Sequence, residues 1–153
     1  KYKNVLLNND ISFEESNHTE SKLLDADIVM KSPGIPDKVA LVQKLIGKGI
    51  PVISEIEFAS KYTSAKIIGI TGSNGKTTTA TLTYELLRQG KLNVALGGNI
   101  GNSFAELVAE ERYENFVLEL SSFQLDGIST FTPHIAVLTN LSPDHLDRYD
   151  YNY

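Results

Sequence analysis

The sequence predicts an α/β fold built around parallel β-strands. Short apolar runs alternate with segments of helical periodicity along most of the 153 residues. The runs at 67–70 and 135–138 are largely apolar, as is typical of strands that helices cover on both faces. Glycine-rich turns separate several strands from the helices that follow them. Strands that alternate with helices in this way pair in parallel.

The composition excludes several classes of protein. Hydrophobic residues make up 41% of the chain and charged residues 22%, which are the proportions of a globular protein. The 14 basic and 19 acidic residues give a net charge of −5, so nucleic acid is not an expected partner. The chain has no cysteine, which excludes disulfides and thiolate metal sites and fits a reducing cytoplasm. Apolar runs are far shorter than the roughly 20 residues that span a bilayer, so no membrane partner is expected.

The first part of the chain is predicted to contain short strands and helices. Residues 1–9 have the pattern of the tail of an amphipathic segment. The elements expected after it are a strand at 11–13, a strand at 27–31, a turn at 32–36, a helix at 39–47, a strand at 51–54 and a helix at 55–62. Two prolines and a glycine enforce the turn.

A polar stretch at 63–66 marks the expected boundary between two domains, residues 1–63 and 64–153. The second domain is predicted to contain strands at 66–71, 93–96, 116–120 and 134–139 and helices at 76–89 and 103–110. The chain opens on Lys1 rather than Met and stops on the polar, aromatic stretch 147–153. We therefore expect a fragment at both ends, because a domain normally closes its own core.

The strongest functional signal is the glycine-rich loop between the strand at 66–71 and the helix at 76–89. Its residues are Gly72, Ser73, Asn74, Gly75, Lys76, Thr77 and Thr78. Glycines let backbone N–H groups turn toward phosphate oxygens, the helix N-terminus adds its positive dipole end, and a lysine reaches the terminal phosphates. Thr77 can then hold Mg²⁺. Ile70 replaces the first glycine of the usual pattern, so this is a variant phosphate loop, and the alternative is a turn with a surface lysine.

Two more side chains are candidates for the same edge of the sheet. Glu119 ends an apolar strand at a point where nucleotide-hydrolysing proteins hold magnesium, and the alternative is a solvated strand end. His145 follows the strand that ends near Asn140, and the alternative for it is a surface hydrogen bond. The carboxyl ends of parallel strands share the edge where ligands bind. No Asn-Lys-x-Asp motif occurs, which counts against a GTPase.

Two further runs follow strands of the second domain. The run 97–102 departs from the spacing of a dinucleotide-binding fingerprint, so we reject a dehydrogenase. It is interpreted as a turn in which Asn99 bonds its own backbone or faces a substrate. The run 121–124, Ser-Ser-Phe-Gln, places hydroxyls and an amide at the same edge. No general base lies beside either serine, which gives nucleophilic serine chemistry little support.

Together, these motifs resemble the Mur ligase family. The runs that carry the resemblance are 71–78, 97–101, 118–125 and 140–148, and their order and spacing match as well. The phosphate loop is shared with folylpolyglutamate synthase, whereas the runs Ser-Ser-Phe-Gln-Leu and Asp-His-Leu-Asp-Arg resemble the D-glutamate-adding branch. The run 32–35 resembles a loop at the end of the family's uridine-binding domain.

The resemblance implies a parallel-sheet, Rossmann-like N-terminal remnant followed by the first part of a P-loop central domain. Residues 1–63 would be the rear of the UDP-binding domain and residues 64–153 the front of the ATP-binding domain. The implied reaction is ATP-dependent ligation of D-glutamate to UDP-N-acetylmuramoyl-L-alanine through an acyl phosphate, in peptidoglycan precursor synthesis. We expect a cytoplasmic monomer, and we expect the fragment by itself to be inactive.

The resemblance also implies roles for individual residues. Lys76, Glu119 and His145 would be catalytic; residues 72–78 would bind ATP; Thr77, Glu119 and His145 would bind Mg²⁺; and Asn99, Ser121, Gln124 and Gly34 would contact the UDP-linked substrate. Two alternatives stay open. One is a sister ligase, or a folylpolyglutamate synthase relative, that adds another amino acid. The other is a P-loop module that binds nucleotide without catalysis.

Overall fold

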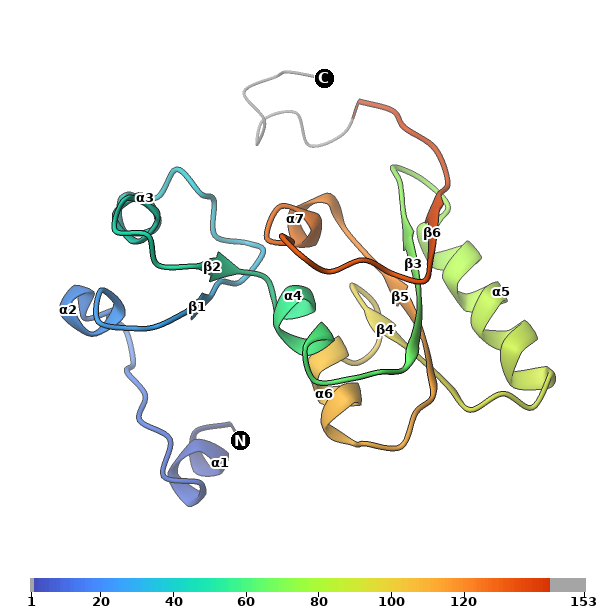
Figure 1. The fold of residues 1–153 in the computed structure, drawn as a ribbon, viewed down its shortest axis with the longest axis horizontal. Helices are drawn as coiled ribbons and strands as arrows, with labels where there is room; N and C mark the ends of the chain where they lie inside the picture. Colours follow the sequence, from blue (N-terminus) through green and yellow to red (C-terminus); the bar gives the residue numbers. More distant parts are fainter. Residues whose placement is uncertain (1, 144–153) are drawn as a thin grey trace.

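The computed structural model describes residues 2–143 and confirms an α/β fold with parallel sheets (Figure 1). Its helices are α1 (Tyr2–Asn8), α2 (Glu20–Leu23), α3 (Ala40–Gly47), α4 (Glu55–Ser60), α5 (Lys76–Gln89), α6 (Phe104–Ala109) and α7 (Ser122–Leu125). Its strands are β1 (Val29–Met30), β2 (Val52–Ile53), β3 (Lys66–Thr71), β4 (Val94–Gly98), β5 (Asn115–Glu119) and β6 (Ile135–Leu138). Within residues 2–143, the helices are too short or too polar to cross a membrane.

The N-terminal region contains a two-stranded parallel sheet. Strands β1 and β2 pair with Val29 opposite Val52, and α3 connects them. The inner face of α3 is apolar because Val42 and Leu45 are one turn apart and both are buried. The strand predicted at 11–13 is wrong. The backbone turns at Asp10, which has a positive φ of 53°, and the segment that follows lies outside both sheets.

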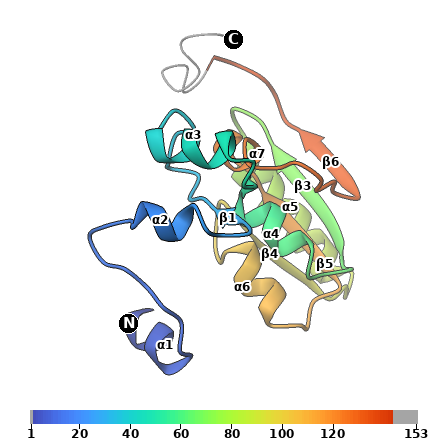
Figure 2. The same cartoon turned by 60° about the vertical axis from the view of Figure 1, so that its left-hand side comes forward.

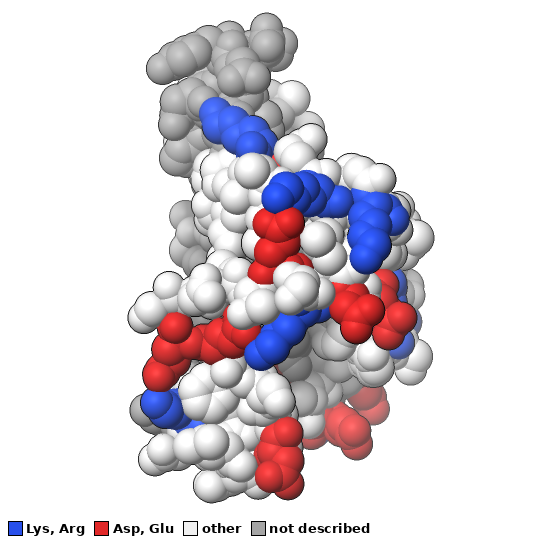
Figure 3. Space-filling view, turned by 90° about the vertical axis from the view of Figure 1, so that its left-hand side faces the viewer, with Lys and Arg blue, Asp and Glu red and all other residues white. Residues whose placement is uncertain are grey.

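Acidic and basic side chains are interspersed on the face that Figure 3 shows. Ion pairs of the N-terminal region join Lys3 to Glu15, Lys22 to Glu14, Lys31 to Asp37 and Lys44 to Glu20, at 2.7–3.0 Å. The exposed pairs among them each contribute about 0–1 kcal/mol to stability, whereas the side chain of Lys31 is largely buried. This face therefore carries mixed charge rather than a field of one sign.

The second sheet has the strand order β4-β5-β3-β6, and all its pairs are parallel. Glu119 at the end of β5 lies opposite Ile70 of β3 and Gly98 of β4. The chain leaves β3 toward β4 on one side and later returns to β6 on the other. The carboxyl end of β3 is therefore a switch point of the sheet, which is where ligands bind in open α/β folds.

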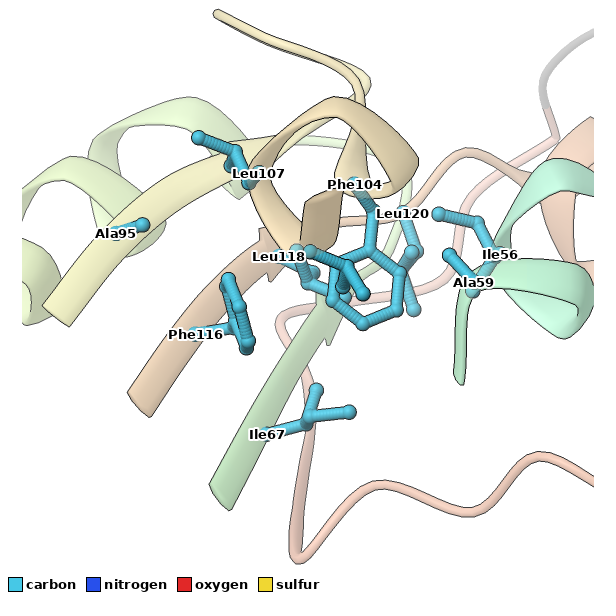
Figure 4. Close-up of a cluster of buried hydrophobic side chains, with 10 residues drawn as sticks. Ile56, Ala59, Ile67, Ala95, Phe104, Leu107, Phe116, Leu118 and Leu120 are labelled. Atoms are coloured by element: carbon cyan, nitrogen blue, oxygen red, sulfur yellow. The ribbon is translucent and has the colours of Figure 1, made fainter. Parts of the chain in front are cut away.

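Helices cover both faces of this sheet (Figure 2). Helix α5 packs against β3, β4 and β5 on one face, while α4 and α6 pack together on the other. Successive side chains of β5 point to opposite faces of the sheet. Phe116 and Leu118 therefore pack in the cluster with α4 and α6, and Val117 packs in the cluster with α5. Figure 4 shows the first cluster, where the rings of Phe104 and Phe116 meet edge to face at 5.1 Å.

Strand β6 departs from the expectation that helices cover both faces of every strand. Ile135 is 55% exposed and Leu138 is 57% exposed. The strand order explains the difference, because β6 is the edge strand and pairs only with β3 among the described residues. An apolar run alone does not distinguish an edge strand from a central one.

Helix α4 packs into the core of the second sheet. Ile56 and Ala59 are buried in the cluster that contains Phe104 and Phe116. Glu55 accepts a hydrogen bond from the backbone N–H of Ala105 at the start of α6, and burial raises the pKa of its carboxyl. The boundary at residue 63 stays a prediction, while these contacts join α4 to the structure that follows it.

A buried carboxylate joins α4 to the segment that follows α7. Glu57 is fully buried, and its Oε2 atom accepts hydrogen bonds of 2.9–3.0 Å from the backbone N–H groups of Ser129, Thr130 and Phe131. The Thr130 hydroxyl donates to Oε1. Burial by itself raises the pKa of Glu57, but the hydrogen bonds from Thr130 and the three amides outweigh it and lower the pKa to about 2.

Candidate functional site

The phosphate loop lies between β3 and α5, as predicted, and two glycines shape it. Gly72 has a φ of +133°, and a Cβ there would lie 2.2 Å from Oγ1 of Thr139. Gly75 has a φ of +83° and is the residue before the first turn of α5. The backbone amides at the start of an α-helix have no intrahelical acceptor, so α5 offers N–H groups and a positive dipole end at this point.

The residues that follow β6 hold the loop in place. The backbone N–H groups of Ser73 and Asn74 donate to the backbone and side-chain oxygens of Asn140 at 3.0 Å. Asn140 in turn donates from Nδ2 to the carbonyl of Asn74, and the Ser73 hydroxyl donates to the carbonyl of Ser142. Sequence reasoning missed this clamp, because side chains 66–69 residues apart meet only through the pairing of β3 with β6.

Lys76 bends back over the loop. Its Nζ atom donates to the carbonyls of Gly72 at 2.6 Å and Ser73 at 3.1 Å. The ammonium group therefore lies within hydrogen-bonding distance of two carbonyls of the loop. The Lys76 ammonium can exchange its bonds to these two carbonyls for stronger, charge-assisted bonds to phosphate oxygens.

Thr77, Glu119 and Asn99 form a hydrogen-bonded cluster at the end of β5. The Thr77 hydroxyl donates to Oε2 of Glu119 at 2.7 Å, and Nδ2 of Asn99 donates to Oε1 at 2.8 Å. Glu119 is only 2% exposed, so the interpretation as a solvated strand end is wrong. Residues from α5, β5 and the loop after β4 thus meet at one point, as the shared edge of parallel strands predicts.

The donor set of this cluster fits a hard divalent cation. Mg²⁺ prefers oxygen ligands and is commonly held in nucleotide sites by one or two protein oxygens together with phosphate oxygens. Thr77 supplies a hydroxyl beside the phosphate loop, and Glu119 supplies a carboxylate hydrogen-bonded to it. His145, the third predicted ligand, lies outside the described residues.

Ser121 and Gln124 cap the short helix α7. The Ser121 hydroxyl accepts from the backbone N–H of Gln124, and Oε1 of Gln124 accepts from the backbone N–H of Ser121 at 3.0 Å. This reciprocal capping box has a structural role in its own right. It also fixes both side chains at the carboxyl end of β5, two and five residues after Glu119.

Gly34 lies in the turn after β1, where a lysine that sequence reasoning missed organises the backbone. The side chain of Lys31 is only 8% exposed; its Nζ atom donates to the carbonyl of Ile35 at 2.6 Å and pairs with Asp37 at 3.0 Å. Lys31 thus closes the turn by bonding, from the end of β1, to two residues on its far side. The signal was a lysine that ends an apolar strand just before a proline-rich turn, but that pattern is also typical of a surface charge.

A strand, a glycine loop and a helix, with a buried carboxylate on the adjacent strand, form the arrangement of a P-loop protein of the α/β class. Residues 70–152 match the family model of the Mur ligase middle domain, and residues 1–40 match that of the MurD N-terminal domain. The chain belongs to the Mur ligase family, which confirms the resemblance drawn from its motifs.

Curated relatives named UDP-N-acetylmuramoylalanine--D-glutamate ligase are similar over nearly the whole chain. The protein of that name from Christiangramia forsetii is 64% identical over 151 residues, and the one from Bacteroides thetaiotaomicron is 57% identical over 151 residues. Both alignments cover 99% of this chain and 34% of the relative. The chain therefore spans about a third of the length of the curated relatives it matches.

Solved structures support the fold alone. A UDP-N-acetylmuramate:L-alanyl-gamma-D-glutamyl-meso-diaminopimelate ligase from Neisseria meningitides superposes with a TM-score of 0.56 at 23% identity, covering 95% of this chain and 51% of that one. A murein peptide ligase from Psychrobacter arcticus gives a TM-score of 0.50 at 20% identity, covering 96% of this chain and 37% of that one.

Proposed function

We propose that the full-length protein joins D-glutamate to UDP-N-acetylmuramoyl-L-alanine in an ATP-dependent reaction of peptidoglycan precursor synthesis. The observation that carries the proposal is the hydrogen bond between Thr77 and the buried Glu119, directly beside Lys76 of the phosphate loop. The names of the relatives, at up to 64% identity, support the D-glutamate substrate. So does the run Ser-Ser-Phe-Gln-Leu at 121–125, which lies at the same edge of the sheet.

The chemistry requires that two anions approach each other. The L-alanyl carboxylate of the acceptor attacks the γ-phosphate of ATP, which forms an acyl phosphate and releases ADP. The amine of D-glutamate then attacks the acyl carbon, displaces inorganic phosphate and loses a proton as the amide forms. The Lys76 ammonium and the amides of the first turn of α5 neutralise the repulsion between carboxylate and phosphate. Mg²⁺, held by Thr77, Glu119 and His145, supplies further positive charge when bound. Catalysis then consists mainly of positioning and charge stabilisation.

The acceptor is positioned by groups on neighbouring loops. Asn99, Ser121 and Gln124 all lie at the carboxyl ends of β4 and β5. The capping box uses Oε1 of Gln124 and so fixes the orientation of its side-chain amide at this edge of the sheet. Gly34 lies in the turn that Lys31 closes, and we assign it to the uridine end of the acceptor on the resemblance of residues 32–35 to a loop of the family's uridine-binding domain.

The test is phosphate release by the full-length protein with Mg-ATP and UDP-N-acetylmuramoyl-L-alanine. D-glutamate, L-alanine, L-lysine and meso-diaminopimelate are offered in turn, and each sister amino acid is also offered with its own cognate acceptor. We expect release only with D-glutamate. Release with another amino acid on its own acceptor would instead identify a sister ligase. No release under any pairing, with ATP binding retained, would identify a non-catalytic nucleotide-binding module.

We further infer that the enzyme acts as a monomer in the cytoplasm. The absence of cysteine from the sequence is compatible with a reducing compartment. Light scattering on the full-length protein checks the oligomeric state, and cell fractionation checks the compartment. A stable dimer, or recovery with the membrane fraction, would contradict this inference.

A further inference from the structure

Asn99 contacts Glu119 through both its side chain and its backbone. Its Nδ2 atom donates to Oε1 of Glu119 at 2.8 Å, and its backbone N–H donates to the Glu119 carbonyl, also at 2.8 Å. The two residues are 20 positions apart in the chain and lie on different structural elements. Two bonds to one residue fix the orientation of Asn99 relative to Glu119 more tightly than either would alone.

The loop that carries Asn99 is built to cross the end of β5 closely. Gly98 has a φ of +97°, and a Cβ there would lie 2.4 Å from the carbonyl oxygen of Glu119. A Cβ at Gly97 would lie 2.5 Å from Cδ1 of Leu107 and 2.7 Å from the carbonyl of Asn102. Glycine is thus required at both positions, and the close approach brings the Asn99 amide within reach of the buried carboxylate.

The two oxygens of Glu119 have separate partners. Asn99 holds Oε1, and Thr77 contacts Oε2. An amide NH₂ can only donate to a carboxylate, and the Asn99 bond sets the rotation of the Glu119 carboxylate plane. A residue that hydrogen-bonds to a metal-binding carboxylate, without binding the metal itself, orients that carboxylate. Loss of such a residue typically weakens metal affinity about 10- to 100-fold.

We propose that Asn99 is a positioning residue that orients the Glu119 carboxylate toward a divalent cation at Thr77. This inference rests on the proposed function, since it takes Glu119 as a ligand of the cation. It differs from the expectation that Asn99 only contacts the acceptor. If Asn99 acts through Glu119, its loss weakens the binding of metal-nucleotide even when no acceptor is present.

The experiment measures nucleotide binding by the full-length protein without acceptor, by titration calorimetry. Wild type, Asn99→Ala and Asn99→Ser are each titrated with ATP in MnCl₂ and with ATP in EDTA. We expect the Mn-ATP affinity of both variants to fall at least about tenfold, and their metal-free ATP affinity to stay within about twofold of wild type. Wild-type Mn-ATP affinity in both variants would overturn the proposal.

Two further variants separate positioning from other effects. Asn93→Ala is the matched control, because Asn93 lies just before the opposite end of β4 and bonds the carbonyl of Arg112. It should bind Mn-ATP as wild type does. On a Glu119→Gln background, Asn99→Ala should cause no further loss, whereas additive losses would show that Asn99 does not act through Glu119 and would overturn the proposal.

The design also separates this inference from the ligase reaction. A wild-type protein that releases no phosphate with any amino acid would contradict the proposed function. The Mn-ATP titrations contain no acceptor and require no turnover, so they test the role of Asn99 in either case.

Discussion

The Thr77 hydroxyl and the Glu119 carboxylate are 2.7 Å apart, although 42 residues separate them in the chain. They meet because β3 and β5 are adjacent and in register, with Ile70 opposite Glu119, and because α5 starts directly after the loop that follows β3. This contact joins the phosphate loop to the acidic end of the neighbouring strand.

Replacing Glu119 by alanine should raise the magnesium requirement of the full-length enzyme. The change removes the carboxylate beside Thr77, so we expect the Mg²⁺ concentration for half-maximal phosphate release to rise about tenfold or more. A magnesium titration at saturating ATP measures the effect. Glu106→Ala, an exposed residue of α6, is the control, and a superimposable titration for both variants would count against Glu119 as a ligand.

Lys76→Ala should reduce kcat of the full-length enzyme by about 10²- to 10³-fold or more, because it removes the cation nearest the loop carbonyls of Gly72 and Ser73. Steady-state phosphate release at saturating substrates measures the loss. Lys91→Ala, at an exposed residue just beyond the C-terminal end of α5, should keep normal turnover. Near-normal turnover of Lys76→Ala would contradict the assignment of residues 72–78 as an ATP-binding phosphate loop.

Alanine at Gly72 should destabilise the protein more than alanine at Gly75. Both have a positive φ, but only the Cβ at Gly72 would collide with Thr139 and the backbone of Asn140, while nothing in the described structure lies within 4 Å of a Cβ at Gly75. We expect a loss of about 2–4 kcal/mol for Gly72→Ala and about 1 kcal/mol for Gly75→Ala. Chemical denaturation measures both, and equal losses would contradict the packing argument.

The buried carboxylate of Glu57 should make the free energy of unfolding depend on pH in the acidic range. Its pKa of about 2 in the folded protein lies below the ordinary value of 4.5, so its ionised form stabilises the fold above pH 4.5. That contribution, on the order of 3 kcal/mol, is lost as the pH falls from about 4.5 to about 2.

Unfolding free energies measured from pH 7 to pH 2.5 for wild type and Glu57→Gln provide the check. The difference between the two proteins should be largest at neutral pH and shrink steadily below pH 4.5. A difference that is independent of pH would indicate that Glu57 stabilises through packing alone.

Lys31→Met should weaken binding of the UDP-linked acceptor. The turn around Gly34 would lose the bond to Ile35 and the ion pair with Asp37, so its shape would be less well defined. We expect KM for the acceptor to rise about tenfold, with kcat and the KM for ATP within about twofold of wild type. Lys38→Met, an exposed lysine of the same segment, is the control, and an equal rise in both variants would remove the special role of Lys31.

Much of the second sheet could be predicted from the sequence. The boundaries expected for β3 and α5 coincide with those observed, because an apolar run, two glycines and a helical periodicity are all local signals. The short helices α2 and α7, of four residues each, were not predicted. Single turns depend on capping contacts rather than on periodicity, and the Ser121 and Gln124 pair shows this directly.

Among the described residues, the positions of Thr77 and Glu119 at one edge of the sheet were predicted, whereas several contacts there were not. Glu119 was expected at the edge that Thr77 reaches, and it lies there. Its bond to Asn99 was not expected, because the sequence leaves open whether that amide bonds its own backbone, a ligand or another residue. The amide cradle around Glu57 carries no sequence signal, since its donors are backbone groups 72–74 residues away.

The sequence by itself determined most of the order of strands and helices in the second sheet, the glycine loop and the Mur ligase family, because periodicity, glycine positions and motif order are properties of neighbouring residues. Only the tertiary structure decided which strand is the edge, which face of α4 is buried and which partners hold Glu119 and Glu57. Those outcomes depend on strand order and register, which are set by the packing of segments far apart in the chain.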